Sequence, residues 1–181
     1  SRGDDIGAST FAYASDPQQV AQPTSREHVE DLDLWLVEFE NGVRLNIKRT
    51  DFAERQVILS ANLGEGRLTL PSDRMALADA LDAAFLAGGL AAHTEEDLRR
   101  LTAGRQAQLG FDMGDDHASF SSSTTADDQL LALEMMCAFI RHPGWRDTGL
   151  TQMKRHLPLI HDGMLHSVQG PATLDFLPAL W

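Results

Sequence analysis

The chain has 181 residues, of which 43% are hydrophobic, and this length is sufficient for one ordinary domain with its own core. Acidic residues outnumber basic ones 27 to 15, so the formal charge of -12 argues against a nucleic-acid partner. Cys137 is the single cysteine, which excludes an intrachain disulfide, and no apolar run is long enough to predict a membrane span.

Residues 1–30 are polar and rich in turn-forming residues, and they predict a linker or an extended arm. Phe11 and Tyr13 are the aromatic residues of this segment, and we expect them to anchor it on a neighbouring surface. The folded domain is expected to span residues 31–181.

Three strands are predicted after residue 32. Apolar and polar residues alternate over 34–39 and again over 43–48, and Asn41-Gly42 between the two runs predicts a β-hairpin. A third strand is expected over 56–63, where Gly64 and Gly66 end it.

The next segments predict two helices. An apolar stripe runs through residues 76–89 and ends at Gly88-Gly89, which favours a helix with one face toward the core. The sequence Thr94-Glu95-Glu96-Asp97 is typical of a helix N-terminus, because the threonine can cap it and the acidic first turn suits the helix dipole.

The rest of the chain predicts a second hairpin and two further helices. Strands are expected over 105–111 and 118–124, followed by a long helix that Asp127 caps and that runs to about Arg141, with Cys137 on a buried face. Another helix is expected from about Asp147, with an interruption at Pro158. This order predicts an α+β two-layer sandwich, in which helices pack on one face of a mostly antiparallel sheet.

The helix predicted over 76–89 carries the most informative pattern. Asp79, Asp82 and Ala83 have the spacing of an inverted zinc motif, H-x-x-E-H. In that motif two histidines one turn apart bind zinc and a glutamate polarises water. Both histidine positions lack an imidazole here, so the spacing predicts the counterpart of a catalytic helix without its chemistry. Asp79 and Asp82 can share one face of the helix, but a solvated pair is the favoured interpretation.

Other polar groups do not predict a site. His156, His161 and His166 recur every fifth residue, so their side chains would point in different directions around a helix. Asp112, Asp115 and the adjacent acidic residue lie around Gly114, but they lack the spacing of a calcium loop and predict a turn. We therefore expect neither a metal nor a cofactor in this chain.

Several segments, taken in order, resemble the insulinase/pitrilysin family of zinc metallopeptidases, the inverzincins. They are the hairpin over 39–44, the strand and loop over 59–66, the helix over 76–89, the strand pair over 111–125 and the helix stop at His142-Pro143. The resemblance implies the fold shared by LuxS and the processing peptidases. It places this chain with the degenerate, non-catalytic domains of the C-terminal half, because family members pair a zinc-binding domain with a related domain that has lost the metal.

The resemblance also implies a function and partners. The parent protein would hydrolyse peptides at a zinc site in its other half, and this chain, inactive alone, would form part of the peptide-binding chamber. Its partners would be the catalytic half and a peptide substrate, which would contact a sheet edge or the surface by Gly64, Glu65 and Gly66. Several family domains continue further, so a truncation at Trp181 is expected. The resemblance makes the bacterial periplasm one candidate compartment, while the cytoplasm and a dimeric state stay open.

Two alternatives stay open at this point. The chain could be a catalytically silent subunit or protein-interaction module of the same fold, with the active partner on a separate polypeptide. It could also be an unrelated α+β domain. An intact H-x-x-E-H upstream in the parent reading frame would favour the chamber domain over the silent subunit.

Overall fold

The structure is a computed structural model, and it describes residues 11–14 and 20–167. The strands are β1 (Pro23–Val29), β2 (Leu34–Phe39), β3 (Arg44–Lys48), β4 (Val57–Leu63), β5 (Gly110–Met113) and β6 (Ala118–Thr124). The helices are α1 (Met75–Ala84), α2 (Glu95–Leu101), α3 (Gln129–Arg141) and α4 (Asp147–Leu165). Antiparallel strands and packed helices confirm the predicted α+β class.

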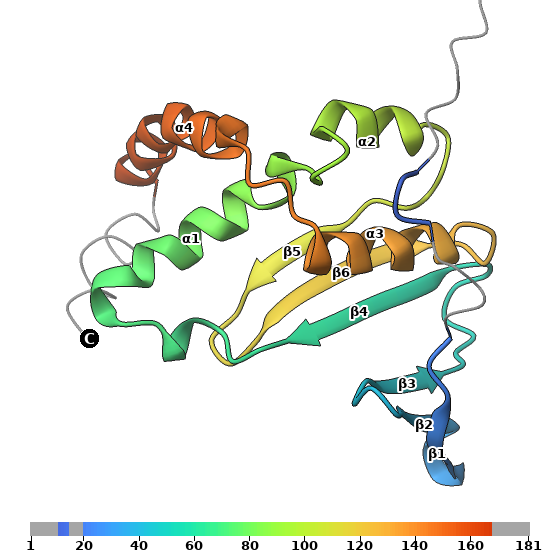
Figure 1. Ribbon diagram of the computed structural model, residues 1–181. Coiled ribbons are helices and arrows are strands. Elements are labelled where there is room, and N and C mark those ends of the chain that lie inside the picture. The colour runs from blue at the N-terminus through green and yellow to red at the C-terminus, as the bar shows by residue number, and fades with distance from the viewer. Residues whose placement is uncertain (1–10, 15–19, 168–181) are drawn as a thin grey trace, which may run out of the picture.

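The main sheet has the strand order β4-β6-β5 and carries the helices on one face (Figure 1). Strand β6 pairs along its whole length with β4, from Val57 opposite Thr124 to Leu63 opposite Ala118. Residues alternate along β6, so Phe120, Ser122 and Thr124 are buried while Ser121 and Ser123 are exposed. Helix α1 packs on β5, and α3 packs on β6 and β4.

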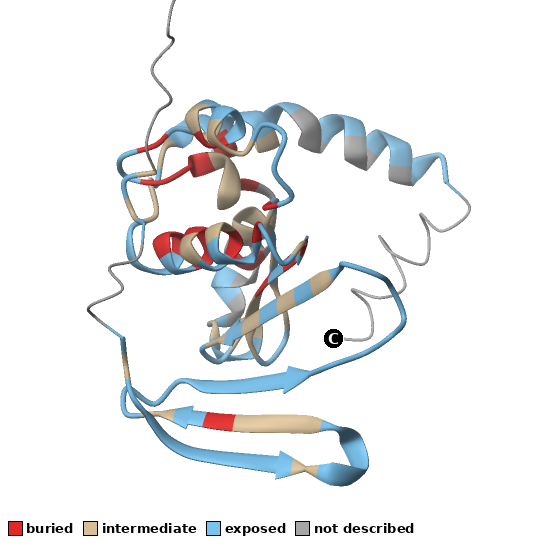
Figure 2. Ribbon diagram, turned by 90° about the vertical axis from the view of Figure 1, so that its right-hand side faces the viewer, coloured by how far each residue is buried: buried red, intermediate tan, exposed pale blue. Residues whose placement is uncertain are grey.

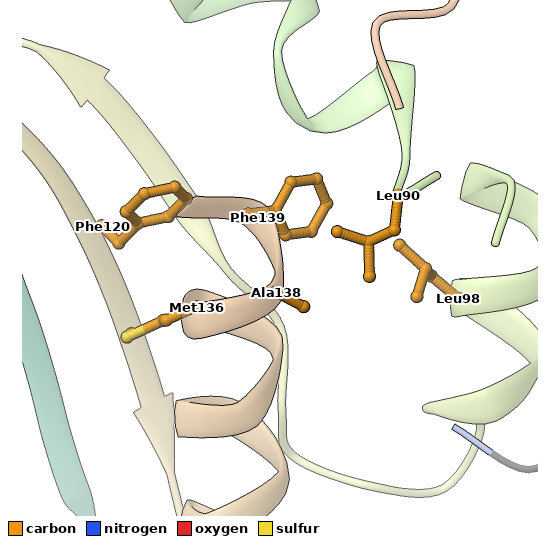
Figure 3. Close-up of a cluster of buried hydrophobic side chains, with 6 residues drawn as sticks. All are labelled: Leu90, Leu98, Phe120, Met136, Ala138 and Phe139. Carbon is orange, nitrogen blue, oxygen red and sulfur yellow. The ribbon is translucent and has the colours of Figure 1, made fainter. Parts of the chain in front are cut away.

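The core lies between this sheet and the helices. Its fully or nearly fully buried members come from α2, α3, the central strand β6 and the loop that precedes α2 (Figure 3). They are Leu90, Leu98, Phe120, Met136, Ala138 and Phe139. Phe85, at the end of α1, adds ring contacts of 4.6 Å with Phe111 and 5.9 Å with Phe139 between ring centroids. The amphipathic helices therefore bury their apolar stripes against one side of the sheet.

Helix α4 packs on α1 and lies farther from the sheet (Figure 1). Its Gly149 meets the backbone of Ala84 so closely that a Cβ at this position would overlap the Ala84 carbonyl. The predicted interruption at Pro158 is wrong, because α4 continues through this residue to Leu165.

Strands β1, β2 and β3 form a second sheet, although the sequence suggested that all strands belong to a single sheet. It lies below the main sheet in both Figure 1 and Figure 2, on the side opposite the helices. All of residues 23–48 are described, and Val37 alone among them is buried. The hairpin predicted at Asn41-Gly42 is confirmed, with Gly42 at φ 82° in its turn. The prediction of a linker or arm over residues 1–30 is wrong for 23–29, because these residues form β1.

Three further local predictions need correction. Strand β5 begins at Gly110, although the pattern suggested residue 105, because Gln106 and Gln108 use their carbonyl groups to accept from side chains of β6. The N-cap of helix α3 is Asp128 and not Asp127, so the helix begins one residue later than expected. Cys137 is exposed, so the predicted core thiol lies on the outer side of α3.

Candidate functional site

The three motif positions lie on α1, and the structure describes the side chain of one of them. Asp82 is about a third exposed, and its carboxylate accepts a hydrogen bond from the backbone N–H of Met113. The same carboxylate lies 3.4 Å from the guanidinium of Arg67. The side chains of Asp79 and Ala83 lie outside the described residues. Asp82 therefore binds two protein donors and does not face an open ligand position.

Arg67 completes this arrangement from the other side. Its guanidinium donates two hydrogen bonds to the carbonyl oxygen of Met113, at 2.9 and 2.6 Å, and lies 3.7 Å from Asp115. Asp82 and Arg67 together take up both the N–H and the C=O of Met113. The two charges thus close the outer edge of the main sheet at the end of β5.

The loop Gly64-Glu65-Gly66, which the sequence suggests as a peptide contact, leads directly into this arrangement. The N–H groups of Arg67 and Leu68 donate to the carbonyl oxygens of Gly114 and Asp115, both at 2.9 Å. Gly66 has φ 68° and lies against the backbone of the β5–β6 turn, where a Cβ would overlap it. Gly64 and Glu65 are exposed. The second half of the loop is therefore fixed, and the first half faces solvent.

The opposite edge of the main sheet is open. Strand β4 pairs with β6 on one side, and no described residue pairs with its other side. Its outer face presents Ser60, Asn62 and Ile58, the last with 76% of its surface exposed. An extended peptide could add to this edge through backbone hydrogen bonds.

A small apolar groove lies where α1 and α4 meet. Its volume is about 250 Å³, and it is lined by Ala80, Leu81, Ala84, Phe85, Gly88, Trp145, Arg146 and Leu150. Trp145 is 67% exposed, has φ 46° and meets Phe85 edge-on at 5.4 Å. Arg146 donates to the carbonyl oxygens of Gly88, Leu90, Ala91 and His93, which fixes its guanidinium beside the groove. Sequence patterns did not single out this groove, because its walls come from two helices about 65 residues apart.

Two aspartates outside the motif bind donors at the N-terminal ends of α2 and α3. The backbone N–H of Gln106 and the guanidinium of Arg105 hold the pKa of Asp128 below its usual value. Hydrogen bonds from the hydroxyl and the backbone N–H of Thr94 lower the pKa of Asp97 in the same way. Both carboxylates are engaged by neighbouring donors, which indicates a structural role.

The remaining predicted groups do not converge. Asp115 faces Arg67, while Asp116 lies 2.6 Å from His117. His166 lies 2.8 Å from the carbonyl oxygen of Asp162, and the side chains of His156 and His161 lie outside the described residues. Within the described residues, no group of three or more His, Cys, Asp or Glu side chains could hold a metal ion. The donors near Asp82 therefore do not fit a zinc ion.

Comparisons with known proteins bear on the fold. Neither a protein-family model nor a curated protein matches the sequence. Among solved structures, the periplasmic protease PqqL from Escherichia coli matches 98% of this chain with a TM-score of 0.68 and 19% identity. The ferredoxin protease FusC, in complex with Arabidopsis ferredoxin, matches 87% of it with a TM-score of 0.69 and 16% identity. The chain spans 18% of the length of each protease. It therefore has the fold of a domain-sized segment of these two proteases.

Proposed function

We propose that this chain is a non-catalytic domain of an insulinase/pitrilysin-type zinc metallopeptidase and forms part of the chamber that holds the peptide. The shared fold with PqqL and FusC supports this proposal, as does the small part of each protease that the chain spans. The zinc site would lie in another domain of the parent protein, which is the first partner of this chain.

The role of Asp82 carries the non-catalytic assignment. A catalytic helix would direct its motif side chains toward a metal ion and a water molecule. Asp82 instead binds the N–H of Met113 and the guanidinium of Arg67. This carboxylate therefore connects α1 to β5. Such a structural role requires no metal ion.

Peptide contact is best supported at the free edge of β4. Asp82 and Arg67 bind the backbone of Met113 at the edge of β5. The edge of β4 is unpaired within the described residues, so it offers the backbone groups that an added strand needs. The exposed Gly64 and Glu65 continue from the end of this strand. The formal charge of -12 favours peptide segments that carry lysine or arginine.

A turnover experiment tests the inactivity. The whole chain is incubated with zinc and an unstructured, lysine-rich peptide, and the products are followed by mass spectrometry. We expect no cleavage above that of the peptide alone. Turnover that a chelator abolishes would refute the assignment, since it would require a functional metal site within these residues.

A binding experiment tests the edge. Amide resonances of the whole chain are followed by NMR while the same peptide is added at low salt. We expect shifts along Val57–Leu63 that weaken with added salt, and weaker binding in Glu65→Gln than in the matched variant Glu27→Gln on β1. Shifts confined to β5, or to the groove between α1 and α4, would contradict the proposed peptide site.

A silent subunit is the second candidate, and the β1–β2–β3 sheet favours it. Val43, Leu45 and Ile47 are 53, 42 and 49% exposed, and they extend the face of this sheet that carries Trp35 and Val37. A separate catalytic polypeptide could cover this face. The parent reading frame separates the candidates, because an intact H-x-x-E-H on the same polypeptide supports the chamber domain. An active partner encoded separately supports the subunit.

We also propose a bacterial periplasmic setting, because PqqL is a periplasmic protease. Among the described residues, none of the helices combines the length and the apolar character that crossing a membrane requires. Fractionation of cells that express the parent protein tests the compartment, and sedimentation of the purified chain tests whether it forms a dimer.

A further inference from the structure

Residues 11–14 lie on the helical layer, against residues about 80 positions later in the chain. The backbone N–H of Ala12 donates to Nε2 of His93 at 2.9 Å, and the hydroxyl of Tyr13 accepts from the N–H of Ala92 at 2.9 Å. His93 is 6% exposed. A short segment of the N-terminal region is thus bound to a nearly buried imidazole by a directional hydrogen bond.

Aromatic contacts reinforce this bond. Phe11 stacks on His93 with ring centroids 5.7 Å apart, and Tyr13 stacks on His142 at 4.9 Å. Both Phe11 and Tyr13 pack against the core cluster that contains Leu90 and Phe139. The docked segment therefore covers part of the apolar core that would otherwise face water.

The direction of the hydrogen bond fixes the protonation state of the imidazole. A backbone N–H can only donate, so Nε2 of His93 must offer a lone pair and the ring must be neutral. A protonated ring would place an N–H group against the N–H of Ala12. We propose that residues 11–14 and His93 form a proton-operated latch, in which the segment docks on the neutral ring and is released when the ring takes up a proton.

Charged groups lie close to the ring. Asp97 on α2 interacts electrostatically with His93, although Thr94 already binds this carboxylate. The guanidinium of Arg146 lies 3.2 Å from the carbonyl oxygen of His93. Tyr13 meets the ring edge-on at 6.0 Å between centroids, and His142 in turn stacks on Tyr13. None of these replaces the acceptor that Ala12 requires.

The sign of the pH dependence follows from the acceptor. The released state binds one more proton than the docked state, so docking is complete at high pH and weakens as the pH falls. Free imidazoles titrate near about pH 6.5, and one linked proton changes the docking equilibrium by at most about tenfold per pH unit. Release uncovers the core surface under Phe11 and Tyr13 and makes it available to other chains. The latch does not depend on the proposed peptidase function.

Tyr13 is the only tyrosine in the chain, which provides a single-residue probe. The whole chain, labelled with ring-13C tyrosine, is studied by NMR from about pH 8 to about pH 5. We expect the ring resonances to move from a docked to a solvent-like position, with a pH dependence of one proton. His93→Gln keeps an acceptor that does not titrate and should abolish this pH response. His142→Gln removes the stacking ring but should retain the response.

Two results would overturn the latch: resonances of Tyr13 that do not change over this pH range, and an unchanged transition in His93→Gln. If His93→Gln does not fold, as judged by circular dichroism, Ala12→Pro gives the same test from the other partner of the bond. It removes the donor without changing the helical layer. Its Tyr13 should be solvent-like already at high pH and show no further step, and a wild-type transition in this variant would also refute the proposal.

Discussion

The carboxylate of Asp82 in α1 accepts a hydrogen bond from the backbone N–H of Met113 at the end of β5. Arg67 lies between the two residues, with its guanidinium on the Met113 carbonyl and on Asp82. The residue whose spacing suggested the glutamate position of a zinc motif therefore joins a helix to a sheet edge. The structural role of Asp82 can therefore be tested by measuring the free energy of unfolding of its variants.

Asp82→Ala should destabilise the fold, because it leaves the half-buried N–H of Met113 without its acceptor and removes a charge partner of Arg67. We expect a loss of about 1–3 kcal/mol in the free energy of unfolding. Asp82→Asn should lose less, since its amide oxygen can still accept. Urea denaturation measures both, with Asp112→Ala as an exposed control that should change by less than about 0.5 kcal/mol. Equal effects of Asp82→Ala and Asp112→Ala would argue against this structural role.

The contact between α1 and α4 predicts opposite effects of one substitution at two glycines of α4. Gly163→Ala should stabilise the chain by up to about 1 kcal/mol, because no atom lies near the added methyl group. Gly149→Ala should cost about 1–3 kcal/mol, because the methyl group would overlap the Ala84 carbonyl. Thermal unfolding of the two variants measures these changes. A higher stability of Gly149→Ala would contradict the close contact, because it would show that α1 and α4 can separate at no cost.

The loop before α1 offers a second matched pair. Gly64 and Gly66 both have a positive φ, of 64° and 68°, so alanine should cost at least about 1–2 kcal/mol at either position. Gly66→Ala should lower the free energy of unfolding by about 1–3 kcal/mol more, because its methyl group would overlap the backbone of His117 and Asp115. Denaturant midpoints of the two variants measure the difference. Similar midpoints would mean that the loop is not fixed to the β5–β6 turn.

Asp128 predicts a specific loss of stability in acid. The Gln106 N–H and the Arg105 guanidinium lower its pKa in the folded state, so the unfolded state binds the proton more readily. The stabilisation is therefore present above the ordinary aspartate pKa of about 3.9 and is lost as the pH falls through the lower folded value. Unfolding midpoints of the wild type and Asp128→Asn should differ at about pH 6 and converge toward about pH 2. Asp127→Asn, which alters the exposed neighbour, should follow the wild type throughout.

Local patterns were sufficient for much of the secondary structure. The turn at Asn41-Gly42 and the capping box of Thr94 with Asp97 depend on residues a few positions apart, and both appear where the sequence indicates. The strand over Ala118–Thr124 follows from its alternation in the same way. These features are decided by short-range sterics and hydrogen bonds.

The site depended on contacts that no local pattern contains. Arg67 reaches Met113, and Arg105 reaches Asp128, across loops whose paths are set by packing. Alternation identified the strands but not their partners, so the division into two sheets was not predictable. Cys137 was misassigned because a run of apolar residues in a helix does not show which side meets the sheet.

The β1–β2–β3 sheet also has a consequence for the behaviour of the chain at high concentration. Its two outer strands are unpaired along their free sides within the described residues, and such strands can template growth between molecules. Arg26 and Glu27 on β1, and Arg44 and Lys48 on β3, place charges on these strands. Natural sheets use such charges as gatekeepers against fibre formation. Neutralising these four side chains would therefore make the chain prone to aggregation, while its helical layer stayed intact.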